Sequence, residues 1–350
     1  MLRRRSYGTR LVRFLSFDSF PRYLTPRTRV IADLLPHVAM LLCGVLLAWF
    51  GGEWFVKGGV SLALWARWPT AIVGATVAAF GTSSPEMMVA IHAARSGVPQ
   101  IALGDIMGSN VINVSLVLAI VVAMAGLRTG GKDVMRDWGM ALVLPVLLGW
   151  IFYDGLFSRG DAAVLLLCFS AWMFRMLKDA RAHARAHRES GEHYDPAPLR
   201  KTLIFLLIGL VMLIGAAQLV VHGGQGVAQV LGWSNFIVGV VVVAIATSTP
   251  ELATTLIARM RGHDEVGLGN ILGSNIFNMC IVAALIALIR PCEVSFEEVW
   301  PSLAFSFGTV LLIFPGKNSR LGRTRGFLLL GCYVAFVIFT LRSGGSSAVH

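Results

Sequence analysis

Charged side chains are scarce in this sequence. Asp, Glu, Lys and Arg together make up 14% of the 350 residues, whereas a soluble globular domain carries about 25%. Hydrophobic residues make up 56%, and the mean hydropathy is +0.71. Long polar stretches are scarce too, because apolar runs of about 20 residues, enough to cross a hydrocarbon core as a helix, recur along most of the chain. These features exclude a soluble globular protein and predict an integral membrane protein.

The sequence also lacks the patterns of several other protein classes. Its five cysteines have neither CxxC nor His/Cys ligand spacing, so we expect no disulfides and no zinc site. The apolar runs contain no HExxH, no GxSxG, no Ser/Lys couple and no paired aspartates, so we expect neither an enzyme nor a cofactor. The net charge of +11 does not indicate nucleic-acid binding, because no soluble domain could carry a basic groove.

The apolar runs are continuous rather than alternating with a period of two, which favours helices over a membrane barrel. We therefore predict an all-α polytopic membrane protein with ten transmembrane helices. The predicted spans are 37–62, 70–95, 101–126, 137–153, 161–178, 201–221, 235–259, 266–289, 299–315 and 326–342.

One long polar connection divides the predicted helices into two sets of five. Its sequence is RAHARAHRESGEHYDPAPLRK, and we interpret it as a linker. The predicted organisation is a basic N-terminal tail at 1–36, a first five-helix unit at 37–178, a linker at 179–200, a second five-helix unit at 201–342 and a C-terminal tail at 343–350.

Lys and Arg are distributed unevenly between the two ends of the predicted helices. If the linker is cytoplasmic, that side holds most of them, and the other side keeps only Arg95, Arg159, Arg290 and Arg342. The positive-inside rule then predicts a cytoplasmic linker and, with an even number of spans, both termini outside. We expect the protein to lie in the cell (inner) membrane.

Two features do not follow this simple pattern. The N-terminal tail is rich in arginine, yet the predicted topology places it outside. Two alternatives stay open, translation from a downstream start such as Met40 or a tail that lies against the membrane, and we assign the tail no function. Lys57 lies within a span, where we expect it to pair with Glu53 one turn earlier.

The two five-helix units contain an internal repeat. GTSSPE at 81–86 returns as ATSTPE at 246–251, and at the same shift of 165 residues GDIMGSNVIN at 104–113 matches GNILGSNIFN at 269–278. Five helices is an odd number, so the second copy enters the membrane from the opposite side and the repeats are inverted. Inverted repeats of secondary transporters meet at a pseudo-two-fold axis near the bilayer midplane, where substrate binds. The two acidic motifs are expected to meet there.

Glu86 and Glu251 lie in the interior of the predicted spans 70–95 and 235–259. A charged carboxylate at such a place costs about 2.5–3.5 kcal/mol, and acids inside the membrane are functional by default. A cation bound between the two glutamates would offset this cost. The structural alternative is a pair of protonated or internally hydrogen-bonded carboxyl groups that pack the bundle.

Further oxygen donors accompany each glutamate. The proline directly before it has no N–H, so it frees a backbone carbonyl and breaks the helix, although a simple kink is the alternative. Thr82 and Thr247 lie four residues before the glutamates on the same helical face. Donors of this kind, without imidazole or thiolate, suit Ca²⁺ or Na⁺. The predicted ion ligands are Thr82, Ser83, Glu86, Ser109, Asn113, Thr247, Ser248, Glu251, Ser274 and Asn278.

The third predicted helix contributes Ser109 and Asn113, and its repeat, the eighth, contributes Ser274 and Asn278. In each helix the serine and the asparagine lie one turn apart on the same face. Gly104 and Gly108, and their repeats, form small surfaces that let these helices approach the broken ones, and interhelical contact alone is an equal interpretation. Asp105 stands where the second copy has Asn270. Asp105 has two possible interpretations: it is a ligand on the path by which ions enter, or it is only a charge at the start of a helix.

Together these motifs resemble the paired alpha repeats of the calcium/cation antiporter superfamily, and within it prokaryotic sodium/calcium exchangers. The resemblance extends from about residue 40 to residue 342. It implies ten helices in two inverted five-helix repeats and exchange of Ca²⁺ for Na⁺ by alternating access. Glu86 and Glu251 would be ligands shared by both ions, with the threonines beside them and the serines completing the Na⁺ positions. Ca²⁺, Na⁺ and the lipid bilayer are the expected partners, and no protein partner is evident.

The sequence departs from the family pattern in places. Ala246 begins the second motif where the family has glycine, and Asn278 stands where some exchangers carry aspartate, which lowers the expectation of potassium transport. Glycines at 58–59 and 223–224 make the first and sixth helices candidates for a moving gate. A proton/calcium exchanger built on the same carboxylates stays open as an alternative, and a cation channel is less favoured.

Overall fold

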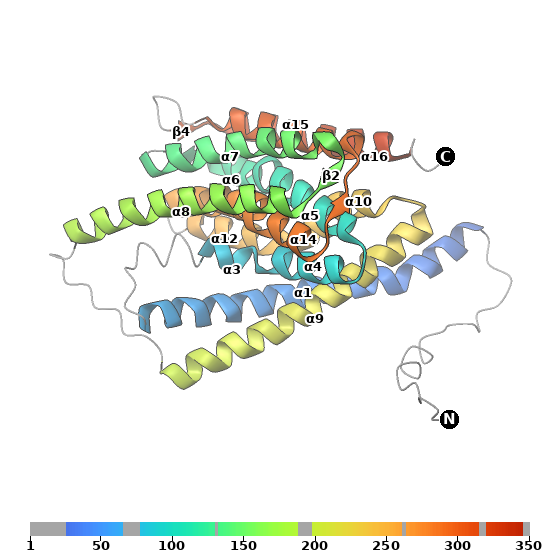
Figure 1. Cartoon of the computed structure of the whole chain (residues 1–350), viewed down its shortest axis with the longest axis horizontal. Coiled ribbons are helices and arrows are strands. Elements are labelled where there is room, and N and C mark those ends of the chain that lie inside the picture. Colours follow the sequence, from blue (N-terminus) through green and yellow to red (C-terminus); the bar gives the residue numbers. More distant parts are fainter. Residues whose placement is uncertain are drawn as a thin grey trace.

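The computed structural model describes residues 26–65, 78–129, 132–187, 198–260, 264–314 and 320–345, and nearly all of them are helical. Figure 1 shows most helices running side by side along the long axis of the molecule. The α-helices are α1 (Pro26–Trp65), α3 (Ala78–Thr82), α4 (Ser84–Arg95), α5 (Pro99–Ile112), α6 (Ala119–Ala125), α7 (Lys132–Ile151), α8 (Arg159–His187), α9 (Leu199–Leu231), α10 (Asn235–Val238), α11 (Ala244–Thr247), α12 (Thr249–Met260), α13 (Asp264–Phe277), α14 (Ala283–Ile289), α15 (Phe296–Leu312) and α16 (Arg323–Gly345).

Eight helical segments among the described residues are long and apolar enough to cross a membrane, and they coincide with eight of the ten predicted spans. The predicted span 299–315 corresponds to α15, which has only 17 residues. The predicted span 70–95 is described from residue 78 onward, as α3 and α4, and its beginning lies outside the described residues. The chain is therefore an integral membrane protein built from helices.

Three helices extend well beyond the predicted spans, and one of them, α9, continues to Leu231, ten residues past the predicted end at residue 221. Helix α1 begins at Pro26, within the stretch predicted as an N-terminal tail, because proline suits the first turn of a helix. Helix α8 continues to His187, into the predicted linker, where alanine and arginine favour helix over loop. Residues 1–25 of the predicted tail and residues 188–197 of the predicted linker lie outside the described residues.

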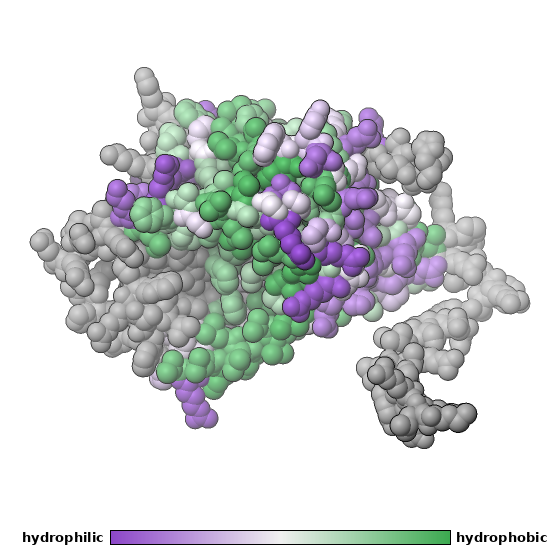
Figure 2. Space-filling model, viewed as in Figure 1, coloured by the Kyte–Doolittle hydropathy of each residue, from purple (hydrophilic) through white to green (hydrophobic). Residues whose placement is uncertain are grey.

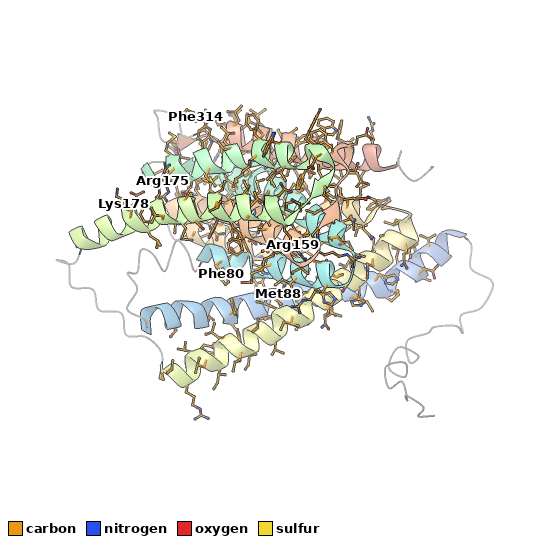
Figure 3. The ribbon with its side chains drawn as sticks, viewed as in Figure 1. Phe80, Met88, Arg159, Arg175, Lys178 and Phe314 are labelled. Carbon is orange, nitrogen blue, oxygen red and sulfur yellow. The ribbon has the colours of Figure 1, made fainter. Side chains whose placement is uncertain are left out.

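Hydrophobic residues form a band across the helices. On the face seen in Figure 2, they occupy the middle of the described structure, and hydrophilic residues gather toward its ends. Helix α8 illustrates this pattern in Figure 3, where Arg159 lies at one end of the helix and Arg175 and Lys178 lie toward the other. Charged groups at both ends of an apolar stretch are what a helix across a bilayer requires.

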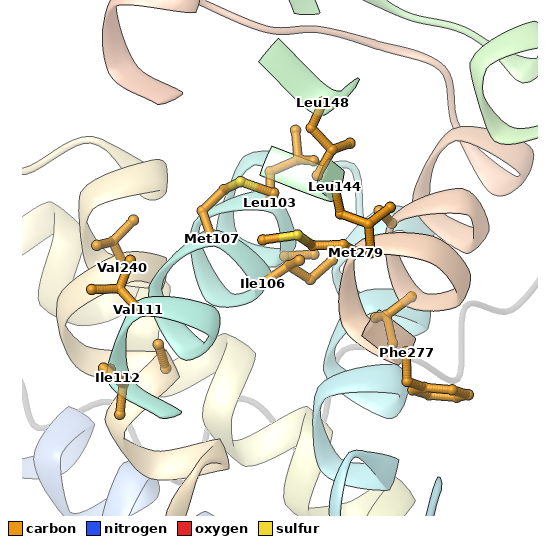
Figure 4. Packing of buried hydrophobic residues seen from close by; sticks show 14 of the residues in the cluster. Leu103, Ile106, Met107, Val111, Ile112, Leu144, Leu148, Val240, Phe277 and Met279 are labelled. Carbon is orange, nitrogen blue, oxygen red and sulfur yellow. The ribbon is translucent and has the colours of Figure 1, made fainter. Parts of the chain in front are cut away.

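The core of the molecule surrounds α5 and α13. Figure 4 shows Leu103, Ile106 and Met107 of α5 packed near Leu144 of α7 and Met279, which follows α13. These side chains are almost completely buried. Polar residues of α5 and α13 are buried with them, so those polar groups face one another rather than lipid, since an unsatisfied polar group in hydrocarbon costs several kcal/mol.

Helices α1 and α9 pack closely through glycines. A Cβ atom added to Gly44 would lie 2.7 Å from Cγ2 of Val220, and one added to Gly209 would lie 2.5 Å from the backbone nitrogen of Phe55. These two contacts are equivalent, because both residues of the second pair are related to those of the first by the shift of 165 residues. The same relation links the contacts Gly58 with Leu206 and Gly223 with Leu41. Residue numbers rise along α1 while those of the contacted residues fall along α9, so the two helices are antiparallel.

Short strand pairs connect the two units at the ends of helices. Strand β1 (Leu127–Arg128) pairs antiparallel with β4 (Arg320–Leu321), and β2 (Leu156–Phe157) pairs antiparallel with β3 (Cys292–Glu293). Each pair joins one strand from the first unit to one from the second, so the units are joined by backbone hydrogen bonds outside the helical band.

Candidate ion-binding site

Two helices are interrupted at equivalent positions. The first passes from α3 to α4 at Ser83 (φ −87°, ψ 8°), and the second passes from α11 to α12 at Ser248 (φ −76°, ψ 4°). The physical cause is the proline two residues later in each motif, which cannot donate to the carbonyl four residues before it. The breaks that the prolines predict are therefore present.

Each glutamate lies in the first turn of the helix that begins after the break. Glu86 is in the first turn of α4, and Glu251 is in the first turn of α12. Backbone N–H groups at a helix N-terminus lack intrahelical partners and favour negative charge. The breaks thus create two positions inside the band at which a carboxylate is stabilised more than it would be in a continuous helix.

The two glutamates are completely buried, and their surroundings differ. Oε1 of Glu251 accepts hydrogen bonds from Ser83 and Ser274, each at 3.4 Å. Neither carboxylate oxygen of Glu86 has a partner with hydrogen-bond geometry among the described residues. Glu86 is within electrostatic range of both Glu251 and Asp105. The motifs therefore meet, as expected from the repeat, and bring acidic groups together.

The threonines of the two motifs form equivalent cross-unit hydrogen bonds. The Thr82 hydroxyl donates to Oδ1 of Asn270 at 3.1 Å, and the Thr247 hydroxyl donates to Oδ1 of Asp105 at 2.8 Å. Thr82 also lies 3.2 Å from the Ser274 hydroxyl. Each broken helix is thus attached to the wall helix of the other unit, α13 or α5.

The two wall helices contact each other through amides. Asn113 donates to Oδ1 of Asn275 at 3.0 Å, and Asn275 donates to the backbone carbonyl of Asn110 at 3.0 Å. Asn278 donates to the Ser109 hydroxyl at 3.3 Å. The carbonyl oxygens of the Asn113 and Asn278 side chains are buried without a partner among the described residues. These oxygens are acceptors that a cation can use.

Both wall helices change to π-helical geometry at the same repeat position. The π-helical segments are η3 (Asn113–Leu118) and η7 (Asn278–Val282), and a third, η6 (Gly239–Val243), precedes α11. Single π-helical turns inside α-helices are frequent at functional sites. Both predicted asparagine ligands begin such a segment.

Glycines allow α5 to approach η6 at backbone distance. A Cβ atom on Gly108 would lie 2.5 Å from the carbonyl oxygen of Val240, and one on Gly104 would clash with the carbonyl oxygen of Phe236. Gly239 faces the same contact, and its Cβ would clash with the carbonyl oxygen of Ile101. The predicted close approach is therefore present for α5 of the first unit, which packs against the broken helix of the second unit. It holds Asp105 against α11. The approach is absent at the equivalent glycine of α13, because a Cβ atom on Gly269 would have no neighbour within 4 Å.

The structure brings the ten predicted ligands together in one buried region. All ten are at most 5% exposed. Hydrogen bonds connect six of them directly, in one cluster of Thr82, Ser83, Glu251 and Ser274 and one pair of Ser109 and Asn278. Sequence reasoning did not select Asn110, Asn270 and Asn275, which line the same region. Their signal was present, because all three lie in the repeated motif of the wall helices.

The region is acidic and lined by oxygen. None of the buried residues in the described part of the chain is Lys or Arg, so no side-chain cation neutralises Glu86, Glu251 or Asp105 there. Carboxylate, hydroxyl and amide oxygens are hard donors that suit Ca²⁺ or Na⁺. Asp105 lies in the second turn of α5 rather than the first and is completely buried, which disfavours its interpretation as a helix-start charge.

A helical membrane protein with two broken helices and an acidic, oxygen-lined region between them belongs to the class of cation transporters. More particularly, the chain belongs to the sodium/calcium exchanger protein family, which matches residues 36–178 and 201–342. These two matches correspond to the two predicted five-helix units.

Individual relatives agree with the family. The chain is 31% identical over 313 residues to the inner membrane protein YrbG of Escherichia coli, covering 87% of this chain and 96% of YrbG. It is 24% identical over 339 residues to the sodium/calcium exchanger MaX1 of Methanosarcina acetivorans, covering 85% and 97%. A solved structure of the sodium-calcium exchanger NCX_Mj, soaked with Na⁺ and Sr²⁺, superimposes with a TM-score of 0.62 at 29% identity, covering 87% of this chain and 98% of that one.

Proposed function

We propose that this protein is a secondary antiporter that exchanges Ca²⁺ for Na⁺ across the cell membrane by alternating access. The observation that carries the proposal is the meeting of Glu86 and Glu251, both completely buried, in a region without a buried Lys or Arg among the described residues. Two such carboxylates are costly inside a membrane unless cations neutralise them. Bound Ca²⁺, or Na⁺ in its place, fulfils that need.

The ten predicted ligands have different roles in this proposal, according to the chemistry of their oxygen atoms. Glu86 and Glu251 bind either ion, and the threonine and serine hydroxyls with the asparagine carbonyls complete the Na⁺ and Ca²⁺ coordination. Because the same carboxylates serve both ions, simultaneous full occupancy is disfavoured by repulsion. The ion-free region carries uncompensated buried charge, so only loaded states cross readily. Shared ligands are thus the physical basis of coupled exchange.

We further propose that the chain has ten transmembrane helices in two inverted repeats. The reciprocal contacts of α1 and α9, together with the equivalent breaks at Ser83 and Ser248, support a two-fold relation between the units. In this arrangement α1 and α9 are the pair that moves to open the site to either side, because they pack against each other through glycines at the edge of the bundle.

The proposed orientation follows from charge. Arg175 and Lys178 lie at the linker end of α8, and Arg159 lies at the other end. The linker is proposed to be cytoplasmic and both termini to be outside, because short loops rich in Lys and Arg remain in the cytoplasm.

A proton-coupled exchanger is the second candidate. Glu86 favours it in one respect, since a carboxylate without a hydrogen-bond partner among the described residues accepts a proton as well as a cation. The two candidates differ in the gradient that drives Ca²⁺ movement.

The test is ⁴⁵Ca²⁺ uptake into liposomes that contain the purified protein, with sodium, potassium and pH gradients imposed one at a time. The proposal expects uptake driven by an outward sodium gradient and none in protein-free liposomes. The variant Glu86→Gln is the site control, and it is expected to reconstitute normally without exchange. Uptake driven by a pH gradient in the absence of sodium would establish the second candidate instead. Sodium-driven uptake that persists in Glu86→Gln would refute the site.

A further inference from the structure

Two histidines face each other between α4 and α9, which pack against each other (Figure 1). The ring centres of His92 in α4 and His222 in α9 are 5.6 Å apart, with 43° between the ring planes. Neither residue belongs to the ten predicted ligands, all of which offer oxygen. Imidazole nitrogen suits Zn²⁺, Ni²⁺ and Cu²⁺, whereas Ca²⁺ takes oxygen ligands. The pair is therefore a separate feature with a different chemistry.

The separation of the two rings matches two imidazoles that share one metal ion. A zinc–nitrogen bond is about 2.0–2.1 Å long, and the ring centre lies roughly 1.1–1.2 Å beyond the nitrogen. With a tetrahedral angle between the two bonds, the ring centres are about 5.2 Å apart. The observed 5.6 Å is close to this value. The distance between the rings thus requires no large movement of either helix for both to bind one ion.

The hydrogen bonds of the two rings leave nitrogen available to a metal. Nδ1–H of His222 donates to the backbone carbonyl of Gln218 at 2.7 Å, which leaves a lone pair on Nε2. A carbonyl acceptor on the other ring nitrogen is the usual companion of a metal-binding histidine, because it fixes the tautomer and the orientation of the ring. Nε2 of His92 lies 3.5 Å from the Ser96 hydroxyl oxygen, a long contact that a metal bond can replace.

Both rings lie near a boundary of the hydrocarbon region. Arg200 and Lys201 stand at the start of α9 and mark one boundary. About 20 helical residues cross the hydrocarbon core, so the opposite boundary is near residue 221, directly before His222. His92 lies one turn before the exposed Arg95 at the end of α4. His222 is exposed and His92 is partly exposed, so an ion in water reaches the pair.

The pair is not copied by the repeat. Under the shift of 165 residues His92 corresponds to Ile257 and His222 corresponds to Lys57. The Lys57 ammonium is paired with Glu53 at 2.6 Å, and isoleucine is no metal ligand. A metal ion bound by the two histidines would therefore act at one side of the membrane, which is the outer side in the proposed orientation.

The site offers two protein ligands, which sets the kind of metal binding. No third His, Cys, Asp or Glu joins the pair in a metal-binding group in the part of the chain that the structure describes. Structural zinc sites use four protein ligands, so water completes the coordination here and the ion exchanges with solvent. Reversible binding suits an ion that regulates the protein rather than one that builds the fold.

We propose that His92 and His222 bind one divalent transition-metal ion, of which Zn²⁺ is the reference, and that this ion holds α9 against α4 and stops ion exchange. Helix α4 carries Glu86, six residues before His92. Helix α9 belongs to the pair that moves in the proposed function. A metal bridge between them joins a moving helix to a helix of the ion region. The inhibition rests on the proposed function, and the metal binding does not.

The binding test is thermal unfolding of the purified full chain in detergent, in choline buffer without Na⁺ or Ca²⁺, at increasing Zn²⁺ concentration. Zn²⁺ should raise the unfolding temperature of the natural protein. His92→Ala and His222→Ala should each need about tenfold more Zn²⁺ for the same shift, which corresponds to about 1.4 kcal/mol of binding free energy.

Two controls identify the place of binding. The double variant His183→Ala/His187→Ala removes two histidines that are four residues apart in α8, and it should keep the full shift. Glu86→Gln should keep it too, because the ion region is not involved. Equal shifts in the natural protein and in both single histidine variants overturn the site, and so does a shift that is lost in Glu86→Gln.

The functional test is sodium-driven ⁴⁵Ca²⁺ uptake into liposomes with Zn²⁺ on both sides. His92→Ala and His222→Ala should exchange like the natural protein without Zn²⁺, and half-inhibition should need about tenfold more Zn²⁺ in each. Mg²⁺, which takes oxygen ligands, should not reproduce the histidine-dependent inhibition. Zn²⁺ that binds to the histidines without slowing exchange overturns the bridge. If no gradient drives Ca²⁺, the proposed function fails, and the unfolding measurement still decides whether the histidines bind metal.

Discussion

Ser83 contacts Glu251 across the ion region, with 3.4 Å between the serine hydroxyl oxygen and Oε1 of the glutamate. The serine lies at the break between α3 and α4, and the glutamate lies in the first turn of α12, so the contact joins the broken helix of one unit to the acid of the other. The equivalent contact, from Ser248 to Glu86, is not made, and the Ser248 hydroxyl has no partner among the described residues. The two units therefore share a plan and differ in the hydrogen bonding of their acids.

This difference predicts unequal effects of neutralising the two glutamates. In ion-free buffer, Glu86→Gln should raise the free energy of unfolding by about 2 kcal/mol, because it removes a buried charge that lacks a hydrogen-bond partner. Glu251→Gln should give a smaller gain, because Ser83 and Ser274 lose a charged acceptor. Thermal unfolding in detergent measures both, and equal shifts would contradict the asymmetry. Stabilisation by added Ca²⁺ should be lost in both variants.

The serines at the two breaks provide a matched pair. Ser83→Ala should destabilise the ion-free protein by about 1 kcal/mol, since it removes a donor to a buried carboxylate. Ser248→Ala should change the stability by less than about 0.5 kcal/mol, because the hydroxyl donates to no described residue. Chemical or thermal unfolding under the same ion-free conditions compares the two. A Ser248→Ala loss as large as that of Ser83→Ala would show that Ser248 has an equally strong contact.

The glycine contacts of α1 and α9 predict a steric effect on transport. Gly209→Ala would place a Cβ 2.5 Å from the backbone nitrogen of Phe55 and 2.8 Å from the carbonyl oxygen of Gly51, so the helices must separate at a cost of about 1–3 kcal/mol. Reconstituted exchange should slow severalfold. Gly215→Ala is the control on the same helix, since its Cβ would lie 3.9 Å from Leu47, an ordinary contact. Similar exchange rates in the two variants would remove the role of close packing.

The proposed orientation predicts which side of the membrane a thiol reagent reaches. In a variant without the five native cysteines, Ser190→Cys in the predicted linker should react with an impermeant maleimide only in inside-out vesicles. Arg159→Cys, at the opposite end of α8 from Lys178, should react only in right-side-out vesicles. Labelling of Ser190→Cys from outside would reverse the topology without affecting the ion site.

Much of the fold follows from patterns that act locally. Continuous apolar runs predicted eight spans that the described helices reproduce, because a helix in lipid must satisfy every backbone group within itself. Helix ends were predicted less well, as α1 and α8 show, because a helix does not have to stop where the membrane does. The pairing of Lys57 with Glu53 was predicted and is present, at 2.6 Å, since one helical turn separates the two residues.

The candidate site was predictable for a related reason. Duplication preserved GTSSPE and ATSTPE, so a constant shift of 165 residues identified both acids and the wall residues without any coordinates. Asn110, Asn270 and Asn275 lie in the same repeated motif, but they were not selected because the repeat alone does not say which sides of a completely buried helix face the acids. Asp105 was open between two interpretations for the same reason.

The sequence by itself determined that this chain spans the membrane as helices, that it is a duplication, and that each copy carries a proline, a glutamate and a set of oxygen donors. Those properties depend on composition, period and repetition, which are all local or additive. Only the tertiary structure decided that Ser83 bonds to Glu251 while Glu86 has no such partner, and that Asp105 adds a third carboxylate to the region. Contacts between residues far apart in the chain depend on how α5, α13 and the broken helices pack, and packing distances of a few tenths of an ångström separate a hydrogen bond from none.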